Sequence, residues 1–568
     1  MVASLLCLDR LTLSNVIVTS GFQHLDWTAD YRLYAKARVD SQALFAPVIA
    51  AAVAHLPALA TLVIAVDDTL RRKSGPKIHG VAWRRDPLGP PFQTNLVRGQ
   101  RYQQFSVAWP VELPPPVATA STATMPPMPP TAIDLETPSL ANPNVSKDPA
   151  DAIPVLANPH ASPAKMVPIA FCHTPGVAKL PKKLQDDEDA KTLHRAERKR
   201  LALTTQTLKH LQLLLTDVPA DRPVLLVGDG SYTNATILKG LPKGISYLGR
   251  TRKDMALHYP PPPAAPPAKG RRPAYGASAP TPEALRQDDS IPWVKIQAYA
   301  SGCLHSFKIK TLEGVQWRKA GAERRFRIIV IAPLGYRLKK NSKMLYRQPA
   351  YLISTMSTGD TASTEGTDGT ASTNNVETQS TASKDNAQSA ATTQSIQSIL
   401  SALGASAAGK PQLAEKKLGA CPANERRQSQ RSVGEELQSY LWRWGIEVNH
   451  REDKTLIGVG DAQVRTENSN QHLPASAVAA YSLLMVAGLH SQAEDPAGLP
   501  PLTRPKWRQA STATGIISAG ELVRQLRFDY WSSTLRSGHY YRFVTETPPD
   551  TNAEKLQPDL AAALFCAA

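Results

Sequence analysis

The chain has 568 residues and a mass of 61.5 kDa, which excludes a single small module and favours two or three folded units. Its formal net charge is +17, from 65 Lys and Arg against 48 Asp and Glu. This charge predicts a polyanion such as nucleic acid as partner and argues against acidic small molecules. Five cysteines without a closely spaced pair exclude a disulfide framework and a zinc knuckle, and they favour a reducing, cytoplasmic location.

The N-terminal part predicts a short helical region over 1–60, with an apolar helix at 43–55. The apolar run 61–66 predicts a strand buried on both faces, with Asp67 and Asp68 at its end. Prolines and a histidine interrupt the uncharged stretch 41–66, so we expect a core helix and a strand there, and no membrane span.

Further strands are expected at 79–83, 101–111, 166–172, 223–227 and 245–250, with helices at 187–215 and 234–241. This alternation predicts an α/β fold whose first part covers 61–112 and 166–255. The intervening segment, 113–165, is rich in Pro, Ala, Ser and Thr, and it predicts a disordered linker because it cannot bury enough apolar surface to offset the entropy of ordering.

The second half predicts four further parts. Residues 256–353 carry strand patterns with interleaved basic residues and indicate a β-rich insertion, whereas 354–430 predict a disordered insert rich in Thr, Ser and Ala. Helices at 433–450 and from Pro474 to 489 would complete the core over 431–490. A C-terminal helical extension and tail, 491–568, includes a helix at 518–535 that begins with a capping box.

Acidic residues follow two of the predicted strands, and another lies on a predicted helix. Asp67 and Asp68 follow the first strand, Asp229 follows the strand 223–227, and Glu447 lies within the helix 433–450. Carboxylates on strand ends of one sheet and on a helix packed against it can meet. Their hard oxygen ligands suit two Mg²⁺ or Mn²⁺ ions, which promote in-line displacement at a phosphodiester.

The helix around Glu447 also predicts a polar face. Tyr440, Arg443, Glu447 and Lys454 fall within a stripe of about 60° at roughly 100° per residue, and Arg451 joins it. A phenol, a guanidinium, a carboxylate and an ammonium on one face are costly to bury and are suited to a metal-bound phosphate. Glu447 and His450 also form Glu-x-x-His, but the chain has no second copy for a di-iron site, so we expect His450 to be structural or to face phosphate.

The segment from Tyr440 through Arg443 and Glu447 to Lys454 resembles, at every fixed position, the Y-(2)-R-(3)-E-(6)-K signature of the DDE transposases of bacterial insertion sequences. The sequence VLLVGDGSYTN around Asp229 is similar to the second-aspartate motif of that family, and VDDT at 66–69 is similar to its first. The likeness covers roughly residues 22–490.

This resemblance implies an RNase H-like mixed sheet flanked by helices and interrupted by a β-rich insertion. It also implies that Asp68, Asp229 and Glu447 are the catalytic triad that binds two Mg²⁺ or Mn²⁺ ions. Asp68 is preferred to Asp67 because it directly precedes Thr69, as in the family motif, and neighbours on a strand point to opposite faces. Tyr440, Arg443 and Lys454 match positions that contact DNA phosphate, and Arg451 shares their face.

The family activity is metal-dependent nicking of double-stranded DNA at the ends of the element. The freed 3′-hydroxyl then attacks target DNA. The resemblance implies a homodimer on paired ends and a place at the bacterial nucleoid. Two alternatives remain open: an RNase H-like nuclease or resolvase that cuts without strand transfer, and a decayed copy that binds DNA without cutting.

Overall fold

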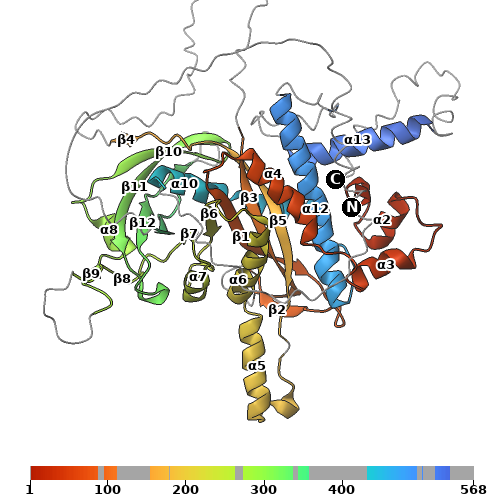
Figure 1. The fold of residues 1–568 in the computed structure, drawn as a ribbon, viewed down its shortest axis with the longest axis horizontal. Helices are drawn as coiled ribbons and strands as arrows, with labels where there is room; N and C mark the ends of the chain where they lie inside the picture. Colours follow the sequence, from red (N-terminus) through yellow and green to blue (C-terminus); the bar gives the residue numbers. More distant parts are fainter. Residues whose placement is uncertain are drawn as a thin grey trace, which may run out of the picture.

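The computed structural model describes residues 2–86, 95–111, 154–262 except 178, 273–336, 343–356, 431–495, 502 and 518–537. In this part of the chain the protein is a mixed α/β structure built on a large mixed sheet of eleven strands, with helices on both faces (Figure 1). The α/β class predicted from the sequence is therefore confirmed.

Helices and strands alternate along the chain as the sequence pattern indicated. The described helices are α1 (Val2–Leu6), α2 (Leu13–Thr19), α3 (Thr28–Ala35), α4 (Ala46–His55), α5 (Glu188–Arg200), α6 (Leu203–Leu214), α7 (Ala235–Gly240), α8 (Pro282–Gln287), α10 (Val433–Trp442), α11 (Gly445–Thr455), α12 (Glu467–Glu494) and α13 (Ala519–Ser537). The described strands are β1 (Leu62–Arg72), β2 (Ala82–Arg85), β3 (Leu96–Pro110), β4 (Val155–Leu156), β5 (Ala164–Thr174), β6 (Val224–Gly228), β7 (Ile245–Arg250), β8 (Leu257–His258), β9 (Ser278–Ala279), β10 (Val294–Ala300), β11 (Cys303–Val315), β12 (Phe326–Ile331), β13 (Gly335–Tyr336), β14 (Leu345–Tyr346) and β15 (Ala350–Thr355).

The centre of the sheet has the strand order β5-β3-β1-β6-β7. Strand β1 is parallel to β6, and β6 is parallel to β7, whereas β3 is antiparallel to both β1 and β5. Every residue of β6 is buried, as expected for a short apolar run in a sheet covered on both faces.

The prediction that β1 ends before Asp67 was wrong. Pairing with β6 stops at Val66, but pairing with β3 continues to Arg72, so both aspartates lie inside the strand. A polar sequence can continue a strand where a neighbouring strand supplies the backbone hydrogen bonds.

The predicted β-rich insertion extends the same sheet. Its strand β15 pairs with β7, and β12, β11 and β10 follow outward, at the end of the molecule away from α12 (Figure 1). The outermost strand is β4, which lies within the range predicted to be a disordered linker and pairs with β10. The linker prediction was therefore wrong for 155–156. Residues 112–153, and 357–430 of the second predicted insert, lie outside the described residues.

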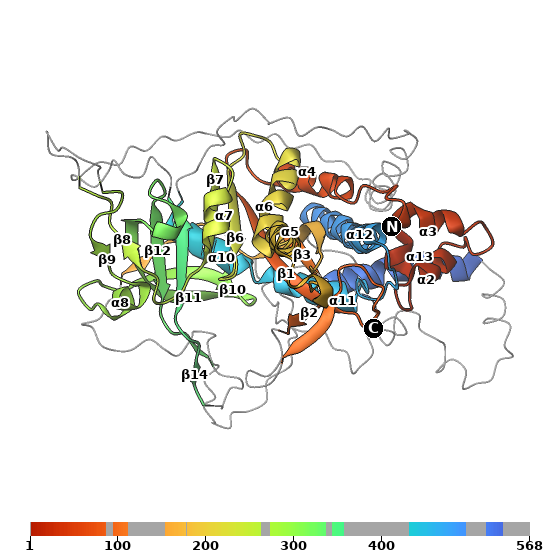
Figure 2. The ribbon, with the colours of Figure 1, turned by 90° about the horizontal axis from the view of Figure 1, so that it is seen from below.

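Two apolar clusters cover the two faces of the sheet. One contains buried residues of α4, α6, α7 and α12, and the other contains buried residues of α10 and α11 (Figure 2). Gly445 allows α11 to begin close to the sheet, because a Cβ at this position would lie 2.5 Å from the Met166 side chain of β5.

Two predicted helices are each divided in two. The range 187–215 forms α5 and α6, and 433–450 forms α10 and α11, with a turn at Arg443 and Trp444. In this turn the amide of Trp444 donates to the carbonyl of Leu441, three residues earlier, at 3.3 Å. Such short-range bonds tighten the backbone, so the single helical stripe assumed for Tyr440 to Lys454 was wrong as a continuous helix.

The prediction that Pro474 opens a helix was also wrong, because α12 begins seven residues earlier at Glu467. Proline has no amide hydrogen to donate to the carbonyl of Asn470, one turn earlier. The hydroxyl of Tyr102 donates to that carbonyl at 3.1 Å instead. Among the described helices, α12 is long and apolar enough to cross a membrane, and 72% of its most apolar window is buried inside the protein.

Candidate acidic site at the centre of the sheet

The two neighbouring aspartates of β1 lie on opposite faces of the sheet. Asp68 pairs with Gln103 in register and accepts a hydrogen bond from the Tyr232 hydroxyl at 3.3 Å. Asp67 pairs with Gln104, on the face that packs against α11. The expectation that strand geometry separates the two carboxylates is confirmed.

Asp67 faces the cations of the signature region. Its Oδ2 lies 3.9 Å from Arg443 Nη1 and 3.9 Å from His450 Nε2. Arg443 also donates from Nη2 to Glu447 Oε1 at 3.4 Å, and its guanidinium carbon lies 5.6 Å from the centre of the Tyr440 ring. Tyr440, Arg443 and Glu447 are thus brought together despite the turn between their helices, and Asp67 joins them.

Asp229 follows β6 and interacts electrostatically with both aspartates of β1. The pKa of Asp67 is raised to about 6, mainly by burial and to a smaller extent by the negative charge of Asp229, against the opposing charges of His450 and Arg443. Burial also raises the pKa of Asp68, where Arg101 opposes the shift and Asp229 adds to it. Burial is thus the main reason that both carboxyls resist ionisation, and the charge of Asp229 adds to it.

This donor set suits a divalent cation by its chemistry, because carboxylate oxygens are hard ligands and Asp229 is close enough to both aspartates of β1 to repel them. As the side chains stand, no group of three or more His, Cys, Asp or Glu within the described ranges is close enough to hold a metal ion. Glu447, whose side chain is 38% exposed, instead contacts Arg443 on the Asp67 face. Asp67 is the β1 acid on that face, while the preference for Asp68 stays a prediction.

Two residues of the predicted polar face lie apart from the acids. Lys454 is an exposed residue of α11, and the charges nearest to it are those of Arg71 and Asp453. Burial of the Lys454 amine and the neighbouring charge of Arg71 lower its pKa. Arg451 is exposed on the same helix and does not contact the acids. These two positions lie about one and two turns beyond Glu447 along α11.

A buried polar chain beside Asp67 was not predicted from the sequence. His450 Nδ1 lies 4.0 Å from Asp453 Oδ2, and Asp453 in turn lies 3.7 Å from Arg71 Nη2. These three side chains are at most 10% exposed. Basic and acidic side chains therefore alternate from Arg71 through Asp453 and His450 to Asp67. The signal in the sequence that could have indicated this chain is the spacing of His450 and Asp453, which are one helical turn apart.

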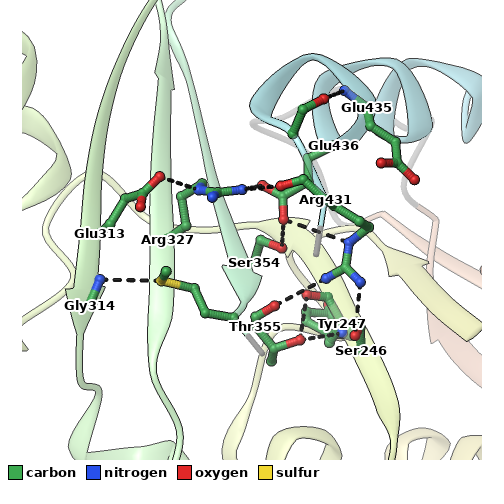
Figure 3. Close-up of polar contacts among 12 residues, drawn as sticks. Ser246, Tyr247, Glu313, Gly314, Arg327, Ser354, Thr355, Arg431, Glu435 and Glu436 are labelled. Carbon is green, nitrogen blue, oxygen red and sulfur yellow. Dashed lines mark hydrogen bonds and ion pairs between the residues drawn. The ribbon is translucent and has the colours of Figure 1, made fainter. Parts of the chain in front are cut away.

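A second buried network fixes the start of α10 on the sheet (Figure 3). Glu436, 2% exposed, lies 3.1 Å from Arg327 Nη1 of β12 and accepts a hydrogen bond from the Ser354 hydroxyl of β15 at 2.5 Å. Arg431 donates to Ser246 of β7 at 3.0 Å. These contacts join the helix pair that carries Tyr440, Arg443 and Glu447 to strands on both sides of the β7–β15 junction.

The raised pKa of Asp67 predicts a pH-dependent stability. Between its ordinary value of 3.8 and about 6, the unfolded chain releases a proton that the folded protein retains, so stability falls as pH rises. The full penalty, present above pH 6, is about 3 kcal/mol. Asp67→Asn should therefore gain up to this amount relative to wild type between pH 4 and pH 7, measured by urea unfolding in EDTA. A difference in unfolding free energy between the variant and wild type that does not vary with pH would contradict the raised pKa of Asp67.

No protein-family model and no curated protein matches the chain. Its function is therefore inferred from the residues and their arrangement.

Proposed function

We propose that the protein is a DDE transposase with an RNase H-like core, which cleaves double-stranded DNA at the ends of an insertion element and joins the freed 3′ end to target DNA. The single observation that carries the proposal is the contact set of the signature. Arg443 bridges Asp67 of β1 and Glu447 of α11 and lies against Tyr440.

The sheet supports the RNase H-like part of the proposal. Its central order, β5-β3-β1-β6-β7, has β1, β6 and β7 parallel and β3 antiparallel to its neighbours, as expected of an RNase H-like sheet. Strands β10, β11, β12 and β15 form a folded insertion between Asp229 and Glu447. A nuclease or resolvase without strand transfer is not expected to carry this insertion, so its presence favours a transposase.

Asp229, Glu447 and one aspartate of β1 would hold two Mg²⁺ or Mn²⁺ ions, which would supply a nucleophilic oxygen and stabilise the leaving oxygen in the displacement. The family motif favours Asp68 as this aspartate, whereas Asp67 is the one that lies on the face of Glu447. Arg443 provides a planar guanidinium beside Asp67 and Glu447 that can donate to a phosphate oxygen. Tyr440 packs against that guanidinium and limits its orientation. Asp67 lies within 3.9 Å of both Arg443 and His450, and it thereby helps to position the guanidinium of Arg443 and α11 on the sheet.

The proposed partners are the double-stranded DNA of the element ends and of the target, with a homodimer on paired ends and a place at the nucleoid. The net charge of +17 supports binding to a polyanion. The proposed function is tested by incubating the protein and Mg²⁺ with labelled duplexes taken from the DNA flanking the reading frame. Cleavage at an inverted repeat, followed by joining to a second duplex, is expected. Cleavage without joining would favour the nuclease, and binding without cleavage would favour the decayed copy.

Lys454→Ala should weaken end binding, because an exposed ammonium beside Arg71 is positioned to contact a DNA phosphate. Loss of one phosphate contact lowers the slope of log affinity against log salt by about 0.9. Fluorescence anisotropy over a salt series, with Ca²⁺ in place of Mg²⁺, measures this slope. Lys319→Ala removes another exposed lysine, in the turn between β11 and β12, and serves as the matched control. Equal slopes for the two variants would contradict the role of Lys454.

A further inference from the structure

A pair of arginines lies on the Asp68 face of the sheet, opposite to the face that carries Arg443. In the antiparallel register, Asp68 is paired with Gln103, and Arg101 lies two residues farther along β3 on the same face. Such diagonal neighbours are about 7–8 Å apart between their Cα atoms, which is within the reach of an arginine side chain. The charge of Arg101 lowers the otherwise raised pKa of Asp68, in agreement with this proximity.

Arg84 approaches the same place from the edge strand β2. Its Nη2 donates to the carbonyl of Thr174 at 3.2 Å, and Arg101 Nε donates to the hydroxyl of Thr174 at 3.2 Å. Thr174 is directly opposite Arg101 at the end of β5. One neutral residue therefore anchors two guanidinium groups.

The two arginines have more donor capacity than the protein uses. Across the described ranges, neither makes an ion pair within 4.0 Å, and the buried Nε of Arg84 has no hydrogen-bond partner. Burial lowers the pKa of Arg84 to about 10, and the positive charge of Arg101 contributes to the same shift. Two mutually repelling charges are costly to bury, and neutral donors could bind Thr174 equally well. Holding the end of β5 therefore does not by itself explain why both residues are arginines.

We propose that Arg84 and Arg101 form a binding site for a backbone phosphate of the DNA on the Asp68 side of the sheet. This inference rests on the proposed function for the identity of its ligand. A phosphate would accept hydrogen bonds from the donors that Thr174 leaves free, and it would neutralise the repulsion between the two guanidiniums. DNA would then contact cations on both sides of the acidic strand β1: Arg443 on one face and the Arg84 and Arg101 pair on the other.

The adjacent residue Arg85 provides a matched control. It carries the same charge on the same short strand, but its side chain is exposed and points to the opposite face from Arg84. Arg84→Ala and Arg101→Ala should each weaken binding of a labelled duplex from the flanking DNA by about ten- to a hundredfold. Each should also lower the salt slope by about 0.9, measured by anisotropy with Ca²⁺ in place of Mg²⁺. Arg85→Ala should cause a smaller loss of duplex affinity and a smaller decrease of the salt slope.

Arg84→Lys guards against a folding defect, because it keeps a cation at the site and is expected to retain the salt slope while binding more weakly than wild type. Slopes for Arg84→Ala and Arg101→Ala that equal that of Arg85→Ala would overturn the phosphate site, even if the wild type cleaves DNA. The opposite combination is also informative. If the two alanine variants have a lower salt slope but the wild type does not cleave DNA, the phosphate site is supported and the proposed function is overturned.

Discussion

Glu447→Gln is expected to lower the rate of element-end cleavage by about a thousandfold, because it removes a charged oxygen ligand from the proposed metal site. The variant should fold. The Glu447 side chain is 38% exposed, and its contact with Arg443, at 3.4 Å, is long for a charge-assisted hydrogen bond. We expect the free energy of unfolding to change by less than about 1 kcal/mol. Single-turnover cleavage with Mg²⁺, alongside urea unfolding, measures both effects.

Glu435→Gln is the matched control for this experiment, because Glu435 lies on the same helix pair and points away from the network around Glu436 (Figure 3). It should cleave at the wild-type rate. Asp229→Asn and Asp68→Asn should resemble Glu447→Gln, whereas Asp67→Asn should lose less activity because Asp67 holds Arg443 and His450. Wild-type cleavage by Glu447→Gln would remove the basis of the proposed function. A greater loss in Asp67→Asn than in Asp68→Asn would assign the metal ligand to Asp67.

Glu436→Ala should lower the free energy of unfolding by about 3–5 kcal/mol, the range for breaking a buried ion pair by removing one partner. Glu436 lies between Arg327 at 3.1 Å and Arg431 at 3.7 Å, and both guanidinium groups are nearly buried. Burial raises the pKa of Glu436, although the charges of both arginines oppose this shift. The intact network is therefore costly to desolvate. Removal of the Glu436 carboxylate leaves Arg327 with Glu313, at 2.6 Å, and takes the compensating charge of Glu436 away from the buried Arg431.

Urea unfolding of Glu436→Ala, with Glu435→Ala as control, tests this prediction. The control lies one residue earlier in the first turn of α10 and should cost less than about 1 kcal/mol, the range for a helix N-terminal charge. Similar values for the two variants would show that Arg327 and Arg431 find other partners. A large loss for Glu436→Ala alone would establish that α10 depends on this anchor to β12 and β15.

Local patterns in the sequence were sufficient to predict most elements. The apolar runs at 61–66 and 223–227 became part of β1 and β6, because a strand covered on both faces needs apolar residues at nearly every position. The strand expected at 245–250 became β7. The spacing of Tyr440, Arg443 and Glu447 identified residues that do contact one another. The α/β class and the strands of the insertion also followed from the sequence alone.

Long-range contacts decided the rest. Pairing with β3 carried β1 past its aspartates to Arg72, and close packing of Gly445 on Met166 accompanied the division of the predicted helix into α10 and α11. A hydrogen bond from Tyr102 allowed Pro474 to lie inside α12. The packing of α11 against one face of the sheet decided that Asp67, and not Asp68, lies on the face that carries Glu447. A local pattern reports which side chains favour burial or solvent, but not the partner that satisfies a backbone group or a charge, since that partner comes from a distant segment.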